Sequence, residues 1–299
     1  MLQKSSKIWM NGKFVDWDKA NTHVLTHTLH YGSGVFEGIR CYNTEKGPAI
    51  FRLKEHVERM FNSAKLVNIK IPYSEDEMIN AIVETVKINK LNACYIRPIA
   101  YFGYGEMGLN TKPCKVDVAI AVWPWGAYLG EKALKEGIRM MISRQKRNFG
   151  YLNKAKITGN YHHSSIAKAE ALDSGYEEAL MLDDRGFVAE ATGENLFFIK
   201  GDNLVTPKEG SILMGITRDS IMAIAKDLGM KVVEKDVTKE ELFSADEVFL
   251  TGTAAEVTPV KSINDYEFLK PNKSLELQKR YFEIVNGKNK KYEKWLTFV

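Results

Sequence analysis

The stretch Asn153-Lys-Ala-Lys-Ile-Thr-Gly-Asn-Tyr161 sets one lysine, Lys156, shortly before a glycine and the expected start of a helix. A buried lysine at such a position can act as an amine nucleophile. The chain has 42 lysines and arginines, however, so a lysine near a glycine is ordinary, and this stretch alone predicts a solvated side chain. A chemical role for Lys156 therefore depends on matching residues elsewhere in the sequence.

A carboxylate follows at the end of an expected strand, in the segment Ala189-Glu-Ala-Thr-Gly-Glu-Asn-Leu-Phe-Phe198. Taken alone, Glu190 fits a turn glutamate as well as a functional group. Its position just before a second expected strand is what makes it a candidate.

Two further segments are suited to binding an anion. Met214-Gly-Ile-Thr-Arg-Asp219 leads into a helix expected to begin near Thr217, where free N–H groups and the helix dipole favour a phosphate by up to about 2 kcal/mol. Thr251-Gly-Thr-Ala-Ala-Glu256 follows an expected strand, and its small residues let the backbone approach a ligand closely. Each segment alone is also consistent with a plain turn.

The composition excludes several classes of protein. The chain has 299 residues, of which 44% are hydrophobic and 27% charged, as in ordinary globular proteins of one large domain or two modest ones. The net charge of +4 is the small remainder of 42 basic and 38 acidic residues that are interspersed, so no nucleic-acid partner is expected.

Cysteine usage and apolar runs indicate a cytoplasmic protein without a membrane segment. The three cysteines, Cys41, Cys94 and Cys114, are too widely spaced for a disulfide framework or a CxxC metal site. The longest apolar run, residues 118–129, contains Pro124 and Gly126 and is far shorter than the roughly 20 residues of a membrane helix. The N-terminus has no continuous apolar stretch of the kind found in secretory signals.

Hydrophobic patterns predict an α+β protein. In the first half, strands are expected at Ile8–Met10, Lys13–Val15, Cys94–Phe102 and Val116–Trp123, with helices from about Leu53 and from the capping box Ser74-Glu-Asp-Glu77. In the second half, strands are expected at Ile138–Ser143, Ala179–Leu182, Phe187–Glu190, Leu196–Ile199 and Val248–Thr251, with helices at Tyr161–Leu172 and Thr217–Leu228. A turn-rich aromatic segment, residues 123–130, suggests the boundary between two domains.

Two other motifs carry no function in this interpretation. Gly103-Tyr-Gly-Glu-Met-Gly108 matches the dinucleotide-binding pattern, but no amphipathic helix follows it, so a loop is expected. His23, His27 and His30 have a spacing that could bind a metal on a helix. The threonines between them favour a strand instead, so we expect packed or surface histidines and no metal site.

Together and in this order, the segments resemble the branched-chain amino acid aminotransferases among the fold-type IV pyridoxal-phosphate enzymes, over about residues 8–260. The matching pieces are His30-Tyr-Gly32, Val35-Phe-Glu-Gly-Ile-Arg40, Glu55-His-x-x-Arg59, Tyr95-Ile-Arg-Pro98, Pro124-Trp-Gly-Ala-Tyr-Leu129, the segments of Lys156 and Glu190, Gly215-Ile-Thr-Arg218 and Gly252-Thr-Ala-Ala-Glu256. The resemblance implies a small N-terminal α/β domain (1–122), a connection (123–135) and a larger C-terminal domain (136–299) with a β-barrel-like core that carries the cofactor lysine.

The resemblance also implies the cofactor, pyridoxal 5'-phosphate, and the residues that bind it. Lys156 would form the Schiff base and shuttle the substrate's proton, Glu190 would bond the pyridine nitrogen, and Tyr161 the phenolic oxygen. Arg59 would bind the phosphate with the backbone of Ile216 and Thr217 and the Thr253 side chain. Arg59 lies off the apolar stripe of its predicted helix, so this role requires the second domain to cover that face.

For the substrates, the resemblance implies one pocket for branched aliphatic side chains and for the carboxylate of glutamate. Tyr31 and Tyr95 with the amides of Thr253 and Ala254 would surround the α-carboxylate, and Arg97 would bind the second carboxylate of glutamate. The apolar pocket near Gly38 would be formed by Phe36, Trp125, Tyr128, Met107 and Leu109. Leu109 and Thr251 stand where the family pattern has valine and serine.

The function implied is transamination of L-leucine, L-isoleucine and L-valine with 2-oxoglutarate in a ping-pong cycle. In the family, the loops with Tyr31 and with residues 107–109 reach in from a neighbouring subunit, which implies a homodimer or a higher homo-oligomer. The alternatives on the same scaffold are a D-amino acid or (R)-amine transaminase, an aminodeoxychorismate lyase, and a metabolite-binding protein without catalysis.

Overall fold

The computed structural model describes residues 2–126 and 128–299, so Ala127 of the predicted interdomain connection lies outside the described residues. The chain forms two compact units: Met1–Trp125 with Ala155–Asn160 and Ile284–Val299, and Gly126–Lys154 with Tyr161–Glu283. The sequence pattern places residues 155–160 and 284–299 in the C-terminal domain, whereas the structure groups them with the first unit. The predicted domain ranges themselves stay a prediction.

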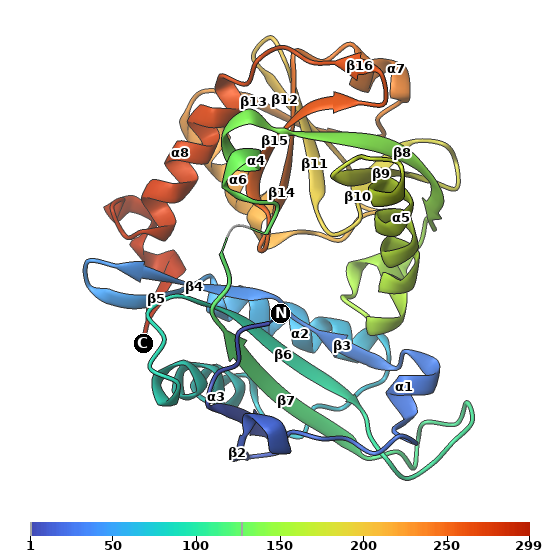
Figure 1. Ribbon diagram of the computed structural model, residues 1–299, viewed down its shortest axis with the longest axis vertical. Helices are drawn as coiled ribbons and strands as arrows, with labels where there is room; N and C mark the ends of the chain where they lie inside the picture. The colour runs from blue at the N-terminus through green and yellow to red at the C-terminus, as the bar shows by residue number, and fades with distance from the viewer. Residues whose placement is uncertain (1, 127) are drawn as a thin grey trace. The chain divides into compact units, whose positions relative to one another are not determined.

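The first unit is an antiparallel sheet with two long helices packed on it (Figure 1). Its strands follow the order β17-β5-β4-β6-β7-β1-β2, and β3 pairs with β6. Its elements are β1 (Lys7–Met10), β2 (Lys13–Asp16), η1 (Trp17–Lys19), α1 (His27–Tyr31), β3 (Gly34–Phe36), β4 (Ile39–Thr44), β5 (Gly47–Phe51), α2 (Leu53–Leu66), α3 (Glu75–Ile88), β6 (Cys94–Phe102), β7 (Val116–Trp123), η3 (Thr158–Asn160), η4 (Lys290–Trp295) and β17 (Leu296–Phe298).

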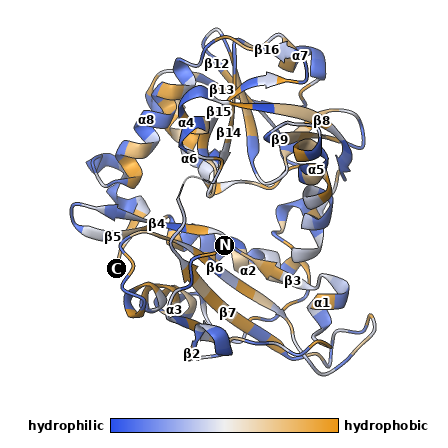
Figure 2. Ribbon diagram, in the orientation of Figure 1, coloured by the Kyte–Doolittle hydropathy of each residue, from blue (hydrophilic) through white to orange (hydrophobic). Residues whose placement is uncertain are grey.

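The core of the first unit lies between the sheet and these helices. The apolar stripe expected on α2 is buried at Leu53, Val57, Met60 and Ala64, and Ile82 and Val86 of α3 join the same cluster. Figure 2 shows hydrophobic colour along β7, whose residues Val118, Ile120 and Val122 alternate into this core. The core therefore follows the periods of 3.6 and 2 that the sequence displays.

The second unit contains a closed ring of six strands. The sheet order β10-β9-β8-β15-β14-β11-β12-β13, with an additional pairing between β10 and β11, closes the ring. This confirms the predicted α+β class with a barrel-like core. The elements are α4 (Glu131–Glu136), β8 (Ile138–Arg147), η2 (Tyr151–Lys154), α5 (Tyr161–Asp173), β9 (Glu178–Asp183), β10 (Val188–Ala191), β11 (Asn195–Lys200), β12 (Asn203–Pro207), α6 (Ile216–Asp227), β13 (Lys231–Lys235), α7 (Lys239–Phe243), β14 (Glu247–Gly252), β15 (Glu256–Ile263), β16 (Tyr266–Glu267) and the start of α8 (Lys273–Val285).

The strand expected around the three N-terminal histidines is wrong. Residues 27–31 form the helix α1, which ends at Gly32 with a left-handed φ of 61° and an N–H bond to the Thr28 carbonyl. The threonines serve local contacts rather than a strand, since the hydroxyls of Thr22 and Thr26 lie 2.7 Å apart. His27 is buried and the other two histidines are exposed, and the GxGxxG segment is a loop as expected.

Within the described part of the chain, the longest helices fall short of the length and apolar character that a membrane crossing requires.

Candidate active site

The first unit fixes the backbone of Lys156 from two sides. The Lys156 carbonyl accepts a bond of 3.1 Å from the Phe36 N–H on β3, and the Lys156 N–H donates to the Ser63 hydroxyl on α2 at 3.0 Å. Gly159 donates to the Gly32 carbonyl at 3.1 Å, so the segment runs along the start of β3. The Lys156 side chain is half-buried, and its amine lies 4.9 Å from the centre of the Phe36 ring. Lys156 is therefore held in place next to an aromatic face.

The Arg97 guanidinium also lies next to the ring of Phe36. The Arg97 guanidinium lies 4.9 Å from the Phe36 ring centre, 5.4 Å from that of Tyr95 and 5.8 Å from that of Trp123. Trp125 packs edge-on against Tyr95 at 4.6 Å between centroids. Among the described residues, the buried Nε of Arg97 has no hydrogen-bond partner. The predicted substrate residues Phe36, Tyr95, Arg97 and Trp125 thus form one cluster, an aromatic cage around a cation.

Gly38 belongs to this cluster because no side chain fits there. A Cβ at Gly38 would lie 2.0 Å from the Tyr95 hydroxyl oxygen, well inside van der Waals contact. The absence of a side chain lets the tyrosine hydroxyl reach past the backbone. This accounts for a glycine at the predicted substrate position.

Arg59 is not on an outward flank, contrary to the helical-stripe interpretation. Its Nε donates to Glu37 Oε1 at 2.7 Å, and a terminal nitrogen donates to Oε2 at 2.8 Å. His56 Nδ1 lies 2.7 Å from the same carboxylate. Burial acts to raise the pKa of Glu37, but the charge and bonds of Arg59 and the bond from His56 outweigh it and hold that pKa well below its usual range. The Arg59 side chain is thus aligned by a buried anion of its own unit.

Three other predicted substrate residues lie on an exposed part of the first unit. Tyr31 on α1, Met107 and Leu109 are 43%, 43% and 87% exposed. His27 joins α1 to their loop, since its Nε2 lies 2.7 Å from the Gly108 carbonyl oxygen. The structure therefore brings these residues to one surface.

In the second unit, three elements hold the Glu190 carboxylate. The Asn195 side chain and the Leu213 N–H each donate to Oε2 at 3.1 Å. Arg147, the last residue of β8, places its Nε 3.2 Å from Oε1. That N–H does not point at the oxygen, so the contact is an ion pair rather than a hydrogen bond. Glu190 is 7% exposed and its orientation is fixed.

Asn195 also connects Glu190 to the start of α6. Its amide nitrogen donates to the Leu213 carbonyl at 2.8 Å, and its Oδ1 lies where a Cβ on Gly215 would come within 2.0 Å. Gly215 is the N-cap of α6 and provides no side-chain cap, so the first amides, of Ile216 and Thr217, are suited to an anion. The predicted nitrogen-binding carboxylate and the predicted phosphate-binding amides thus lie close together.

The turn after β14 completes this group. Asn195 pairs with Thr251 across β11 and β14, and Glu190 pairs with Asn195 across β10 and β11, which sets the three residues in adjacent rows of the sheet. The buried Thr251 hydroxyl has no hydrogen-bond partner among the described residues. Thr253 and Ala254 follow in the turn and are half-buried. The unpartnered Thr251 hydroxyl and the nearby backbone amides fit a phosphorylated, nitrogen-containing ring.

Tyr161 and Tyr128 are the remaining predicted residues of the second unit. Tyr161 begins α5 and lies one turn before Ser164, whose hydroxyl accepts a bond of 2.9 Å from Arg147. Residues three apart share a helix face, so Tyr161 faces the side of Arg147 and Glu190. Tyr128 is 38% exposed, and the Lys168 amine lies 5.7 Å from its ring centre.

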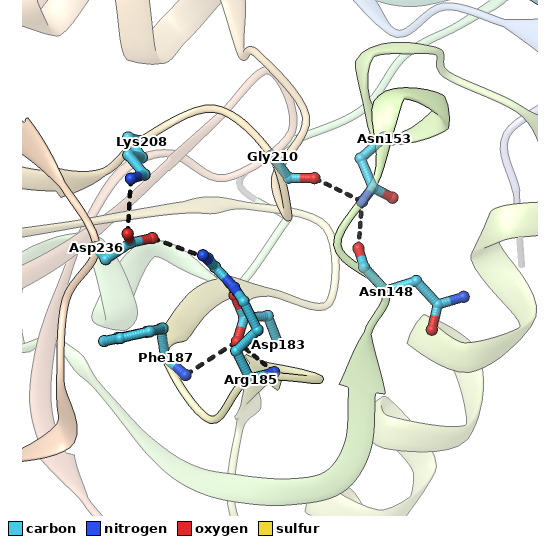
Figure 3. A network of polar contacts seen from close by, with 8 residues as sticks. All are labelled: Asn148, Asn153, Asp183, Arg185, Phe187, Lys208, Gly210 and Asp236. Carbon is cyan, nitrogen blue, oxygen red and sulfur yellow. Dashed lines mark hydrogen bonds and ion pairs between the residues drawn. The ribbon is translucent and has the colours of Figure 1, made fainter.

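The loop that precedes the lysine segment is anchored within the second unit (Figure 3). The Asn153 amide donates to the carbonyls of Asn148 and Gly210, the latter at 2.9 Å. A Cβ on Gly210, which has a φ of 137°, would come within 2.2 Å of the Phe149 ring. The Arg185 guanidinium lies 3.9 Å from the Phe149 ring centre and bonds Asp183 and Asp236. This loop is therefore tied to the segment that leads into α6.

The chain matches the family model described as amino-transferase class IV over residues 34–263. The chain belongs to this family. It is 45% identical to a branched-chain-amino-acid aminotransferase of Pseudomonas aeruginosa (100% of this chain, 99% of the relative) and 42% identical to that of Escherichia coli K12 (99% and 98%). The solved T.th. branched-chain amino acid aminotransferase with pyridoxamine 5'-phosphate has 48% sequence identity and a TM-score of 0.95, covering 99% of each chain.

These matches confirm the predicted family, the fold class, and an enzyme that transfers amino groups between amino acids and oxo acids with the pyridoxal phosphate of class IV aminotransferases. The roles of the individual residues stay predictions. The first unit of this class IV aminotransferase holds Tyr31, Phe36, Gly38, Arg59, Tyr95, Arg97, Met107, Leu109, Trp125 and Lys156, and the second holds Tyr128, Tyr161, Glu190, Ile216, Thr217, Thr253 and Ala254.

Several residues that contact the predicted ones were not predicted from the sequence. Glu37, His56 and Asn195 stand inside motifs already quoted, so their polar character beside Arg59 and Glu190 was a usable signal. Ser63 and Arg147 had none. Arg147 lies beyond Ser143, where the predicted strand ended, although β8 continues to Arg147.

Proposed function

We propose that this chain transaminates L-leucine, L-isoleucine and L-valine with 2-oxoglutarate, using pyridoxal 5'-phosphate in a ping-pong cycle. The observation that carries the proposal is the aromatic cage around Arg97. The apolar ring atoms of the cage contact a branched aliphatic side chain, while the guanidinium that the cage surrounds donates to the second carboxylate of glutamate or 2-oxoglutarate. The names of the relatives favour this activity over the D-amino acid, (R)-amine and lyase alternatives.

When bound, pyridoxal phosphate supplies an aldehyde that takes up the amino group and a ring that stabilises negative charge at the substrate Cα. Lys156 would hold the cofactor through its amine and would move the proton at the substrate Cα. Its fixed backbone favours such a transfer, because proton donor and acceptor must keep a defined distance.

The binding roles follow the two groups of contacts. Glu190 holds the proton at the pyridine nitrogen, and Tyr161 donates to the phenolic oxygen. The phosphate is bound by Arg59, the amides of Ile216 and Thr217 and the Thr253 hydroxyl. The alignment of Arg59 by Glu37 supports its part in this role.

The α-carboxylate is bound by Tyr31, Tyr95 and the amides of Thr253 and Ala254. The apolar pocket is formed by Phe36, Gly38, Met107, Leu109, Trp125 and Tyr128. The Tyr95 hydroxyl, which Gly38 leaves room for, supports this arrangement.

A homodimer or higher oligomer, with sites completed by a neighbouring subunit, is part of the proposal, as is a cytoplasmic location. The first unit exposes a set of large apolar side chains, here named the α1–loop surface: Val24, Leu25, Leu29, Tyr31, Tyr104, Met107 and Leu109. The rings of His23 and Tyr104 pack at a tilt with their centroids 4.2 Å apart, which joins the two segments. Exposed apolar surface of this kind is typical of an interface. The thiols of Cys41, Cys94 and Cys114 are free, which supports a reducing compartment.

The Arg97→Met variant tests whether the Arg97 guanidinium in the aromatic cage binds the second carboxylate of 2-oxoglutarate. We expect KM for 2-oxoglutarate to rise about 30-fold to 200-fold, since a charge-assisted bond contributes roughly 2 to 3 kcal/mol. The rate at which L-leucine bleaches the visible band of the cofactor-loaded protein should change less than about threefold. Arg144→Met, which removes an exposed arginine of the second unit, should change neither.

The substrate class is tested on the unaltered, cofactor-loaded protein. L-leucine, D-alanine and (R)-1-phenylethylamine are mixed with it separately while the visible band is followed. Fast bleaching by L-leucine is expected. Bleaching by D-alanine alone would overturn the proposal, and so would a rise in KM for L-leucine as large as that for 2-oxoglutarate in Arg97→Met.

A further inference from the structure

Arg147 has no role in the function proposed so far, although it is a nearly buried cation beside a predicted cofactor ligand. Its side chain is 11% exposed, and its Nε lies 3.2 Å from Glu190 Oε1. A terminal nitrogen donates to the Ser164 hydroxyl at 2.9 Å and to the Thr192 carbonyl at 3.2 Å. A buried arginine is almost always paired with a group of opposite charge.

The guanidinium is positioned by three separate elements. Arg147 ends β8, Ser164 lies on α5, and Thr192 follows β10. The Arg147 carbonyl accepts a bond of 3.1 Å from the Asp184 N–H, which fixes the backbone as well. The side chain therefore has little freedom to leave Glu190.

The contacts of Glu190 are divided between its two oxygens. Oε2 accepts from Asn195 and the Leu213 N–H, both uncharged donors, and Oε1 faces the positive charge of Arg147. A cation at this distance favours the ionised carboxylate. The surroundings otherwise favour the neutral acid, because Glu190 is 7% exposed and burial disfavours the charged form of a carboxyl group.

We propose that Arg147 is a positioning residue that acts through Glu190, keeping this carboxylate ionised and oriented so that it holds a proton on the pyridine nitrogen of the cofactor. The inference rests on the proposed function for the identity of the cofactor. It adds a residue that touches neither substrate nor reacting atoms in the scheme above. Without Arg147, the buried carboxylate takes up a proton itself or turns away, and the ring nitrogen loses its proton.

The charged and titratable neighbours of Arg147 and Glu190 come from three elements. On α5, His162 and His163 lie near Arg147, and the pKa of His163 is lowered by burial, by His162 and by Arg147. On β9, Glu178 is bonded to Lys168 of α5 at 2.7 Å, so its charge is already compensated. Glu194 follows the turn after β10. Arg147 is thus a cation in direct contact with Glu190, while Lys168 is paired with Glu178.

The test compares Arg147→Met, Arg147→Lys and Glu190→Gln with the double variant Arg147→Met/Glu190→Gln, all loaded with pyridoxal phosphate labelled with ¹⁵N in the ring. Arg147→Met should move the ring nitrogen resonance towards the unprotonated position, and the lysine variant should restore it in part. Arg144→Met on the same strand is the matched control and should leave the resonance unchanged.

The single-turnover rate with L-leucine, normalised to cofactor-bound sites, should fall about 10-fold to 100-fold in Arg147→Met, as is typical when the outer partner of a functional group is removed. KM should change less than about threefold. In the Glu190→Gln background the Arg147→Met change should have almost no further effect, because its target is gone. Additive losses, or an unshifted ring resonance in a folded Arg147→Met protein, would overturn the inference.

Two further measurements test the role of Arg147 independently of the Arg147→Met variant and of the proposed function. If Arg147→Met fails to fold, Ser164→Ala, which removes one bond to the guanidinium, should shift the resonance in the same direction by a smaller amount, and no shift would count against the inference. Thermal unfolding without cofactor should show non-additive losses for the two single variants and the double variant. If the unaltered, loaded protein fails to react with L-leucine, the proposed function falls, whereas the resonance is measured without substrate and still decides the inference.

Discussion

Glu37 shows how a single residue can link two motifs that the sequence keeps apart. It stands between the predicted substrate residues Phe36 and Gly38, yet its carboxylate is directed to Arg59 and His56 on α2. Burial lowers the pKa of His56, which favours the neutral imidazole, and the bond to Glu37 only partly opposes this. The negative charge of Glu37 is balanced by Arg59, and the two hydrogen bonds between them fix the orientation of the Arg59 side chain.

Residue identities at the candidate site were predictable where a motif recurs in the family, and unpredictable where only three-dimensional proximity matters. Lys156, Glu190 and Arg97 carry their chemistry in the side chain and appear in quoted motifs. Arg147 and Ser63 act through a neighbour brought close by the fold, and no spacing in the sequence indicates that neighbour.

Glu194 leads to a prediction about pH at the residue scale. Burial first, and then the neighbouring Glu178 and Glu190 against the charge of Lys168, raises the pKa of Glu194 from 4.5 to about 8. The folded chain then binds one more proton than the unfolded chain between these two values. Stability from this group is fully present below pH 4.5 and is lost as the pH rises through about 8.

Glu194→Gln should therefore stabilise the protein increasingly towards alkaline pH. We expect no difference in unfolding free energy near pH 4.5 and a gain of several kcal/mol at pH 9, because each tenfold change in proton affinity corresponds to about 1.4 kcal/mol and the pKa rises from 4.5 to about 8. Urea unfolding at a series of pH values measures this. Glu45→Gln, at an exposed glutamate, is the control and should show no trend. A constant difference across the range would contradict the raised pKa.

At the scale of elements, the strands of the first unit show which signals a sequence contains. β6 and β7 begin and end where they were predicted, because both are long and carry regular apolar residues on the buried face. β5 was missed because Gly47 and Pro48 oppose a strand locally. It exists because β4 and the C-terminal β17 pair with it, and β17 itself has three residues and no local signal.

The capping box of α3 is an element whose stability can be measured. The Ser74 hydroxyl accepts a bond of 3.2 Å from the Glu77 N–H, and the Glu77 side chain accepts from the Ser74 N–H at 2.7 Å. Ser74→Ala should lower the free energy of unfolding by about 1 kcal/mol, with a range of roughly 0.5 to 2. Asn62→Ala, at an exposed position within α2, should not lower it. Denaturant titration of both variants checks this, and an unchanged midpoint for Ser74→Ala would contradict it.

At the scale of the whole molecule, the sequence predicted a two-part chain with a barrel-like core. It did not predict which segments of the chain belong to each part. Residues 155–160 leave the second unit to bond β3 and α2 of the first, and residues 284–299 return to pair with β5. These are contacts between segments far apart in the sequence. Local patterns determine helices and strands, whereas such long-range pairings depend on the complete fold.

The α1–loop surface gives the prediction for the assembly. The Val24 and Leu29 side chains are 70% and 59% exposed, and neither was assigned to the substrate pocket, so altering them tests association more directly than altering Tyr31 or Leu109. In the double variant Val24→Asp/Leu29→Asp, two carboxylates would have to be desolvated in an apolar contact, which costs several kcal/mol. We expect sedimentation velocity to show a dimer or larger species for the unaltered chain and monomers for the variant.

Activity should fall with association if neighbouring subunits complete each site, and both should recover together as protein concentration is raised. Leu269→Asp is the matched control, because Leu269 is 66% exposed on the second unit and lies outside the α1–loop surface. It should keep the mass and activity of the unaltered chain. A monomeric unaltered chain with full activity would remove the neighbouring subunit from the proposed function, since Tyr31 and Leu109 would then have to act within their own chain or not at all.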